Sequence, residues 1–303
     1  MSKSISTDIR LDPQALCDLC GAGDPSYPII YKDQYRNITG GIARCSRCGL
    51  MYRNPASRTA HLADLYNAQQ YDESACAWIS ARKRVFDRYL DEMEQWRKNN
   101  QVLDVGCGPG FFLDACKSRG WQCSGLELSA SAVRYARDKF GLIIENEAFN
   151  GRKYNDNSFD VVTLWNVLDH LEHPRSTLID IYRIIRPGGC LIVRVPNASF
   201  HLPAYIFFRN LYFIMRQNKI NPAQMGNFSF TAGVLSRLIK TVGFNDIRID
   251  NSRLVWTRTL NDEDTGGLRM LFARLVESIS NGITMVTLGQ YHVSPSITAV
   301  CLK

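Results

Sequence analysis

The chain has 303 residues, of which 45% are apolar and 21% charged, and its formal net charge is +7. This size and apolar content allow a full hydrophobic core, with one large domain and one small one expected. No apolar run reaches the length of about 18 residues that a transmembrane helix needs, and the spread basic excess favours an anionic substrate only weakly.

The ten cysteines bear on the cellular compartment. The N-terminus lacks the apolar core of a signal peptide, so these cysteines indicate reduced thiols and metal ligands rather than disulfides. We therefore expect a cytoplasmic location.

Two Cys-x-x-Cys-Gly knuckles, Cys17 with Cys20 and Cys45 with Cys48, follow a polar N-terminal tail. Two thiolates at this spacing can bind one metal ion from a tight turn, and two such turns complete a tetrahedral four-sulfur site. The spacing predicts one structural zinc ion in a small ribbon over residues 1–55. Four protein ligands leave no open position, so this zinc is not expected to be catalytic.

A helical pattern extends from about residue 61 to residue 98, within an expected helical linker over residues 56–100. Its apolar positions are Leu62, Leu65, Tyr66, Trp78, Val85, Phe86, Tyr89, Leu90, Met93 and Trp96. Basic residues among them favour a solvated helix side over a nucleic-acid-binding face.

Residues 102–110 (VLDVGCGPG) form a buried strand that turns sharply into a helix. Gly106, Gly108 and Gly110 let the backbone approach a ligand closely, and the helix N-terminus offers unpaired N–H groups. The Gly-x-Gly-x-Gly spacing, with Asp104 two residues before it, differs from the Gly-x-Gly-x-x-Gly of dinucleotide sites.

From residue 101 onward, predicted strands alternate with helices, which indicates a parallel sheet with helices on both faces. The expected strands cover residues 102–105, 122–127, 142–144, 159–165, 190–195, 247–249 and 297–302. Two stretches, residues 198–228 and 253–292, interrupt the alternation. The first is rich in aromatic residues and is expected to form a lid over the substrate, with contact to a membrane surface as the alternative.

The glycine loop with Asp104 resembles motif I of class I S-adenosylmethionine-dependent methyltransferases. Nearly the whole chain resembles those members of the family that carry an N-terminal zinc ribbon and act in bacterial natural-product and surface-polysaccharide pathways. The matching segments are residues 48–55, 106–110, 159–174, 186–189, 195–197, 230–231 and 243–244, together with Glu127. The resemblance implies a Rossmann-like α/β fold with a seven-stranded sheet over residues 101–303, preceded by the ribbon.

This resemblance also implies a set of residues that bind S-adenosylmethionine. Glu127, at the expected end of the second strand, would accept both ribose hydroxyls, Leu128 would flank the adenine, and Asp104 would orient the loop and the methionine amino group. The full expected set is Asp104, Gly106, Cys107, Gly108, Gly110, Glu127, Leu128 and Trp165.

The acceptor is expected beyond the end of the fourth strand, because ligands bind at the carboxyl ends of parallel strands. An alcohol must lose a proton during methyl transfer, and an imidazole suits that task near neutrality. His170 is the candidate base, with helix capping or packing as the alternative role, and Asp169, His173 and His201 are further candidates. Relatives that methylate sugar carbon carry a large extra C-terminal domain, so we expect methylation of a hydroxyl oxygen on a small molecule or saccharide.

Two other functions stay open at this point. An RNA methyltransferase could hold RNA with the ribbon, but residues 17–48 contain only four basic residues, Lys32, Arg36, Arg44 and Arg47. A non-catalytic scaffold could use the ribbon to bind protein partners, although it would not need the cofactor loop. No nucleic-acid partner is expected, and no oligomeric state is predicted.

Overall fold

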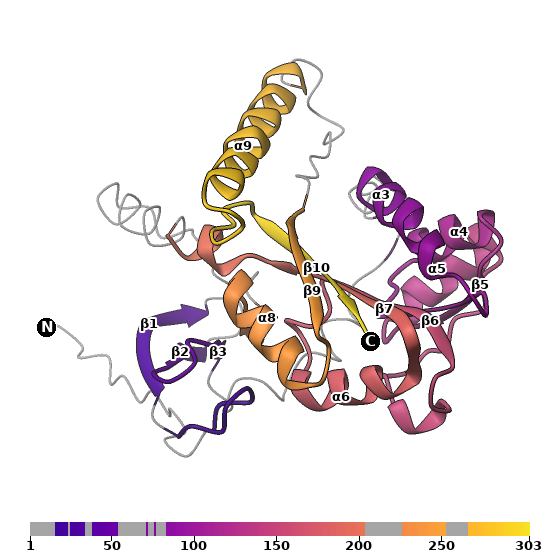
Figure 1. Ribbon diagram of the computed structural model, residues 1–303, viewed down its shortest axis with the longest axis horizontal. Helices are drawn as coiled ribbons and strands as arrows, with labels where there is room; N and C mark the ends of the chain where they lie inside the picture. The colour runs from indigo at the N-terminus through magenta and orange to yellow at the C-terminus, as the bar shows by residue number, and fades with distance from the viewer. Residues whose placement is uncertain are drawn as a thin grey trace, which may run out of the picture.

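The computed structural model describes residues 16–23, 25–33, 38–53, 71, 76, 83–203, 226–252 and 266–303. Its main sheet has six strands in the order β5-β4-β6-β7-β10-β9 (Figure 1). These are β4 (Gln101–Val105), β5 (Gln122–Leu126), β6 (Phe159–Trp165), β7 (Ile185–Pro196), β9 (Asp246–Asn251) and β10 (Ser296–Leu302). The chain is thus a Rossmann-like α/β protein, as expected.

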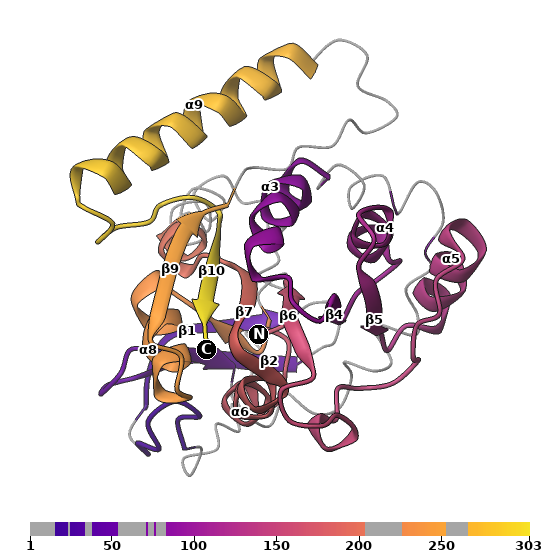
Figure 2. The same ribbon diagram turned by 45° about the vertical axis from the view of Figure 1, so that its right-hand side comes forward.

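Helices cover both faces of this sheet, and the alternation of side chains along the strands explains why. On one face, Val102 and Ile192 pack against α3 (Lys83–Met93), its 3₁₀ extension η2 (Glu94–Trp96) and α4 (Phe111–Ser118). On the other face, Leu103 and Val193 pack against α6 (Pro174–Ile184) and α8 (Ala232–Thr241). Helix α5 (Ala130–Phe140) follows the edge strand β5, and the 3₁₀ turn η3 (Gly151–Lys153) precedes β6 (Figure 2).

Two features of the sheet differ from the expectation. The segment expected as the third strand, residues 142–144, forms no strand, and only Glu145 bridges to Leu126 of β5. Leu142 and Ile144 are buried in a small cluster with α4 and α5, while Ile143 is 94% exposed, so the segment packs by its side chains and not by a ladder. The prediction of seven strands was therefore wrong by one.

The sheet is also mixed, not parallel. Strand β10 runs antiparallel to both of its neighbours, β7 and β9. The crossover through α8 makes β9 parallel to β7, and β10 then enters between them from the opposite end. Adjacent antiparallel strands need no crossover helix.

A second sheet of four strands, in the order β1-β2-β3-β8, joins the N-terminal region to the second half of the chain. Strands β1 (Pro25–Asp33), β2 (Ile38–Cys45) and β3 (Met51–Arg53) come from the region expected as the ribbon, whereas β8 (Phe228–Ser229) comes from the second half. Met51 and Tyr52 pair with Ser229 and Phe228. Buried residues of the knuckles, Cys17, Leu19 and Cys45, share one hydrophobic cluster with α6, α8 and the main sheet.

Helix α9 (Gly266–Val286) projects from the body in both views (Figures 1 and 2). No helix in the described part of the chain combines the length and the apolar character needed to cross a membrane. Most of the expected lid and the first half of the helical pattern before residue 83 lie outside the described residues. The expected domain boundaries at residues 55 and 100 stay predictions.

Candidate active site

The glycine loop connects β4 to α4 and has one open side. Gly106, Gly108 and Gly110 have φ values of +69°, +54° and +82°, which glycine adopts without strain. A methyl group at Gly106 would lie 2.6 Å from Val167 Cγ2, and one at Gly110 would lie 2.7 Å from Leu142 Cδ1. At Gly108 it would meet nothing within 4 Å, so the backbone is approachable there, next to the N-terminus of α4.

Glu127 follows β5 and binds this loop directly. Its Oε2 accepts a hydrogen bond from the Gly108 N–H at 2.9 Å, and its Oε1 accepts one from the Ser129 N–H at 2.7 Å. Burial raises the pKa of Glu127, although the N–H groups of Ser129 and Gly108 oppose the rise. Asn146 Nδ2 donates to the carbonyls of Glu127 and Leu128, and Leu128 presents a 42% exposed apolar surface beside them. The structure thus brings Glu127, Leu128 and Gly108 together.

Asp104 lies below the loop, on β4, and is 1% exposed. Thr163 of the neighbouring strand donates a hydrogen bond from its Oγ1 to Asp104 Oδ1 at 2.6 Å. Burial raises the pKa of Asp104 to about 8, against the effect of this hydrogen bond, and the charge of Glu127 raises it further. The carboxyl group is therefore mostly protonated at neutral pH when nothing else pairs with it.

Cys107 and Trp165 turn their side chains away from the open side of the loop. The Cys107 thiol packs in the small cluster beside Gly125, and burial raises its pKa well above the ordinary value. The Trp165 ring lies among Phe86, Tyr89 and Phe112 beneath α3 and α4, with centroid distances of 5.2, 5.6 and 5.1 Å. The cofactor contacts of Cys107 and Trp165 stay predictions. The backbone N–H of Cys107 already donates a hydrogen bond to the Leu126 carbonyl.

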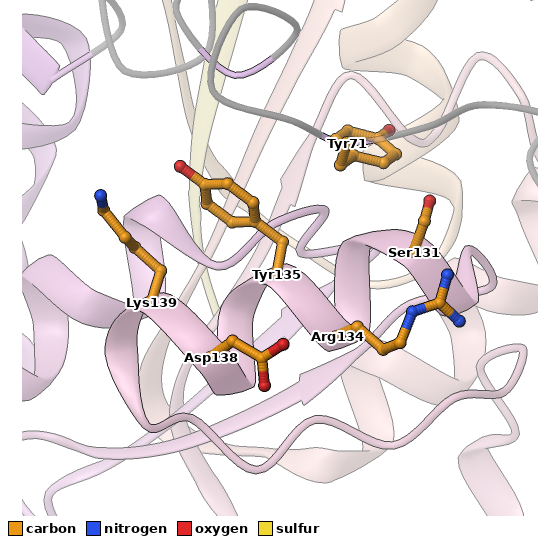
Figure 3. Close-up of a pocket in the computed structure, with 6 residues that line it drawn as sticks. All are labelled: Tyr71, Ser131, Arg134, Tyr135, Asp138 and Lys139. Atoms are coloured by element: carbon orange, nitrogen blue, oxygen red, sulfur yellow. The ribbon is translucent and has the colours of Figure 1, made fainter.

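A pocket of about 370 Å³ lies along the outer side of α5 (Figure 3). It is lined by Tyr71, Ser131, Arg134, Tyr135, Asp138 and Lys139, none of which belongs to the predicted cofactor set. Ser131 shares a hydrogen bond of 3.0 Å with Ser129, so the pocket is adjacent to the segment that contains Glu127.

Comparison with known proteins identifies the family. Residues 77–249, more than half of the chain, match the family model described as a methyltransferase domain. The chain belongs to this methyltransferase family. A ubiquinone biosynthesis O-methyltransferase of Azoarcus sp. is 33% identical over 113 residues, which is 35% of this chain and 48% of that protein. Another protein of that name, from Thiobacillus denitrificans, is 27% identical over 161 residues, 48% of this chain and 69% of the relative.

A solved S-adenosylmethionine-dependent methyltransferase from Archaeoglobus fulgidus is similar with a TM-score of 0.45 and 18% identity, and the match covers 73% of this chain and 94% of that one. Among curated relatives, the Azoarcus protein is spanned for only about half of its length. The family match makes the present chain a methyltransferase, which disfavours the non-catalytic scaffold.

The acceptor side of this methyltransferase is expected past the end of β6. Asp169 is 2% exposed, and its Oδ2 lies 3.3 Å from Nε2 of His170, whose side chain is 32% exposed. Burial raises the pKa of Asp169, while the positive charges of His170 and Arg194 oppose the rise. An imidazole at the surface is thus held beside a buried carboxyl group at the methyltransferase's expected acceptor edge.

The other candidate bases of the methyltransferase have different surroundings. His173 is 69% exposed at the start of α6, and its Nδ1 lies 3.9 Å from Asp18 of the first knuckle. His201 Nε2 lies 2.8 Å from the Pro295 carbonyl oxygen, and burial lowers the pKa of this half-buried imidazole. Neither lies against a buried carboxyl group as His170 does.

The sequence patterns did not reveal several polar residues at this edge. Asn166, at φ +59°, follows β6 and accepts a hydrogen bond of 2.6 Å from Arg194 Nη1. Ser252 accepts another, of 2.8 Å, from Arg194 Nε. One signal was present in the sequence, because Arg194 interrupts an otherwise apolar strand.

The cysteine cluster lies apart from these groups. The Sγ atoms of Cys17, Cys20, Cys45 and Cys48 all lie within 4.8 Å of one another, and the Cys17–Cys48 and Cys20–Cys45 distances are 3.4 and 3.5 Å. A tetrahedral zinc ion with bonds of about 2.3 Å needs sulfur atoms about 3.8 Å apart. Burial disfavours the Cys45 thiolate, but hydrogen bonds that include the Cys48 N–H lower its pKa to about 7. The donor set therefore fits the metal.

Proposed function

We propose that this methyltransferase transfers the methyl group to a hydroxyl oxygen of a small molecule or saccharide, with His170 as the general base. The observation that carries the proposal is the contact between His170 and the buried Asp169 at the acceptor edge. The relatives named O-methyltransferases support oxygen as the methylated atom.

In this proposal, the open side of the glycine loop and the residues around Glu127 hold S-adenosylmethionine, which supplies a methyl group activated by the sulfonium. Glu127 accepts the ribose hydroxyls, and Leu128 covers the adenine. Asp104 receives the amino group of the methionine part, which would favour its ionised form. Because Gly106, Gly108 and Gly110 have no side chains, the cofactor can approach the backbone of the loop closely.

His170 and Asp169 then act on the acceptor. Because Nε2 faces Asp169, the carboxylate fixes the imidazole with its proton on Nε2, and the acceptor proton passes to Nδ1. The resulting imidazolium is stabilised by the neighbouring carboxylate. Positioning the hydroxyl in line with the methyl group supplies much of the remaining acceleration.

We also propose that Cys17, Cys20, Cys45 and Cys48 hold one structural zinc ion, as their geometry allows. The cytoplasmic location and the absence of a nucleic-acid partner belong to this proposal as well. Titration with an RNA of fixed sequence over a series of salt concentrations tests for the RNA alternative.

The test is methyl transfer from labelled S-adenosylmethionine to a panel of alcohols, phenols and sugars, with wild type, His170→Ala and His173→Ala. General-base assistance typically contributes about 10²–10⁴-fold, so we expect His170→Ala to lower turnover within that range without changing cofactor affinity. A general base accepts a proton only in its unprotonated form, so the turnover of the wild type should rise from acidic toward neutral pH. His173→Ala serves as the control and should keep its turnover. Equal turnover of both variants, or a flat pH profile, would remove His170 from the chemistry.

A further inference from the structure

Arg194 is the buried cation of the acceptor edge. It lies on β7, paired with Trp165 of β6 and Thr298 of β10, and it is 7% exposed. Its side chain occupies the face of the sheet that α3 covers, where the residue two positions earlier, Ile192, is part of the core. A guanidinium at such a position loses most of its hydration, which costs several kcal/mol unless other groups compensate.

The groups that hold Arg194 are neutral. Its Nε donates to Ser252 Oγ at 2.8 Å, and its Nη1 donates to Asn166 Oδ1 at 2.6 Å. Within the described ranges, no carboxylate lies within 4.0 Å of the guanidinium, and Nη2 has no hydrogen-bond partner. By contrast, Arg186, on the same strand, is paired with the buried Asp160.

This arrangement holds the guanidinium rigidly. The Asn166 N–H donates back to the Arg194 carbonyl at 2.8 Å, so the two residues are joined by two hydrogen bonds. The Ser252 N–H donates to the Ser296 carbonyl at 2.9 Å, and its carbonyl accepts from Ser294 Oγ at 2.9 Å. A guanidinium with a fixed orientation and an unused edge matches a planar or tetrahedral oxyanion.

Burial lowers the pKa of Arg194 to about 10, and the charges of Tyr89 and then Asp169 oppose this effect. Among the described residues, Asp169 forms no ion pair with Arg194. It already lies beside His170, and its Oδ1 has no hydrogen-bond partner in the part of the chain that the structure describes. The edge therefore presents a buried cation on β7 and an imidazole–carboxyl pair after β6, on two neighbouring strands.

We infer that the acceptor carries an oxyanion, a carboxylate or a phosphate, and that Arg194 binds this group while the hydroxyl to be methylated reaches His170. The inference rests on the proposed function for the role of His170. The anion restores the charge balance of the buried guanidinium, and the two contacts together orient the acceptor. Arg194 is thus a residue that selects the substrate class.

The experiment measures binding alone, so it does not depend on methyl transfer. The probes are benzoate, phenyl phosphate and the uncharged benzamide, titrated by ligand-observed NMR into protein saturated with S-adenosylhomocysteine. We expect one of the two anions to bind the wild type at least 10-fold more tightly than benzamide, and the stronger of them identifies the source as carboxylate or phosphate. In Arg194→Gln this preference should fall by roughly 10- to 100-fold, because charged hydrogen bonds are lost.

Arg248→Gln is the matched control, since Arg248 lies on β9, is 49% exposed and pairs with Glu92 on the surface. It should keep the anion preference. Arg194→Lys keeps the positive charge but loses the forked pair of N–H donors of the guanidinium. It should therefore bind the preferred anion more weakly than wild type, while S-adenosylhomocysteine affinity stays unchanged. If Arg194→Gln does not fold, the anion affinity of Arg194→Lys is the measurement that tests the inference.

Equal binding of anions and benzamide by the wild type would overturn the inference, as would an anion affinity that is the same in folded Arg194 variants. Loss of turnover in His170→Ala is a separate result. A failure of His170 as base would leave the anion preference of Arg194 standing, and a failure of the anion preference would leave the hydroxyl proposal standing.

Discussion

The Glu127 carboxylate ties the end of β5 to the glycine loop through the Gly108 and Ser129 N–H groups. In Glu127→Gln, one side-chain oxygen becomes an NH₂ group, which faces an N–H donor and can no longer accept. We expect S-adenosylhomocysteine affinity to weaken by roughly 1–3 kcal/mol, as measured by calorimetric titration. Glu147→Gln is the control, because Glu147 forms an ion pair with Lys153 at the surface. Unchanged affinity in Glu127→Gln would place Glu127 outside the cofactor site.

The raised pKa of Asp104 predicts that the free energy of unfolding depends on pH. Its folded-state pKa of about 8 is above the unfolded value near 3.9, so between these values the folded state holds a proton that the unfolded state has lost. The free energy of unfolding should therefore fall by about 1.4 kcal/mol per pH unit from this group between about pH 4 and pH 8.

The measurement is urea unfolding of cofactor-free wild type and Asp104→Asn at several pH values. Asn mimics the protonated carboxyl group and can still accept from Thr163, so the stability of the variant relative to wild type should rise with pH. Parallel curves for the two proteins would show that Asp104 ionises normally.

At the residue scale, the sequence patterns singled out site residues that lie on one local segment and its neighbour strand, and their cofactor roles stay predictions. The glycines, Asp104 and Glu127 follow from a local strand–turn–helix pattern and its neighbour strand. The partners of Thr163, Asn166 and Arg194 depend on the tertiary fold, which relates residues up to 59 positions apart, as for Thr163 and Asp104. Such pairings are set by tertiary structure and have no local signal.

At the scale of elements, β8 and the two residues before it connect the ribbon sheet to the acceptor edge. The Arg53 Nε donates to the Gly226 carbonyl at 3.1 Å, and the Phe228 N–H donates to the Asp169 carbonyl at 2.9 Å. A methyl group on Gly226 would lie 2.3 Å from the Asp169 carbonyl oxygen. The backbone of β8 thus packs directly against the residue that contacts His170.

We expect Gly226→Ala to lower the free energy of unfolding by about 1–3 kcal/mol, because the crowded backbone must shift. The control is Gly282→Ala in α9, where a methyl group meets nothing within 4 Å and should stabilise the helix by about 0.5–1 kcal/mol. Denaturant unfolding measures both. A neutral Gly226→Ala would mean that β8 and the Asp169 segment are not in close contact.

Strands β4, β6, β7 and β10 were predictable because each has its own apolar run, whereas β9 alternates Ile247 and Ile249 with polar residues. Helix ends were also readable, since Ser129 and Thr231 cap α5 and α8 with their hydroxyl groups, and Pro174 begins α6. The prediction of a strand at residues 142–144 was wrong because the apolar residues of this segment are buried by packing against helices. Strand β8 is two residues long and exists only through its partner β3.

At the scale of the whole molecule, the cysteine knuckles share their core with the main sheet. Cys17 and Cys45 belong to the cluster that includes α6 and α8, and Arg237 of α8 donates to the Cys48 carbonyl at 2.7 Å. Loss of the metal should therefore destabilise the entire fold and not a separate module.

We expect one equivalent of zinc per chain by elemental analysis of protein purified without chelator. Cys45→Ser should lower the temperature of a single cooperative unfolding transition, since it removes one of four ligands. Cys76→Ser, at a buried cysteine outside the cluster, is the control for zinc content. Two separate transitions in Cys45→Ser, or protein without metal, would contradict this expectation.

The pairing of β3 with β8 also determines when the second sheet can be completed during translation. A ribosome completes β3 long before β8, and residues 54–225 are made in between, which takes roughly 10 to 35 s at 5–20 residues per second. Throughout that interval the nascent hairpin of β2 and β3 has an open edge, and open edges recruit other strands. A nascent chain stalled before residue 226 should consequently be the form of this protein that associates with chaperones or with its own copies.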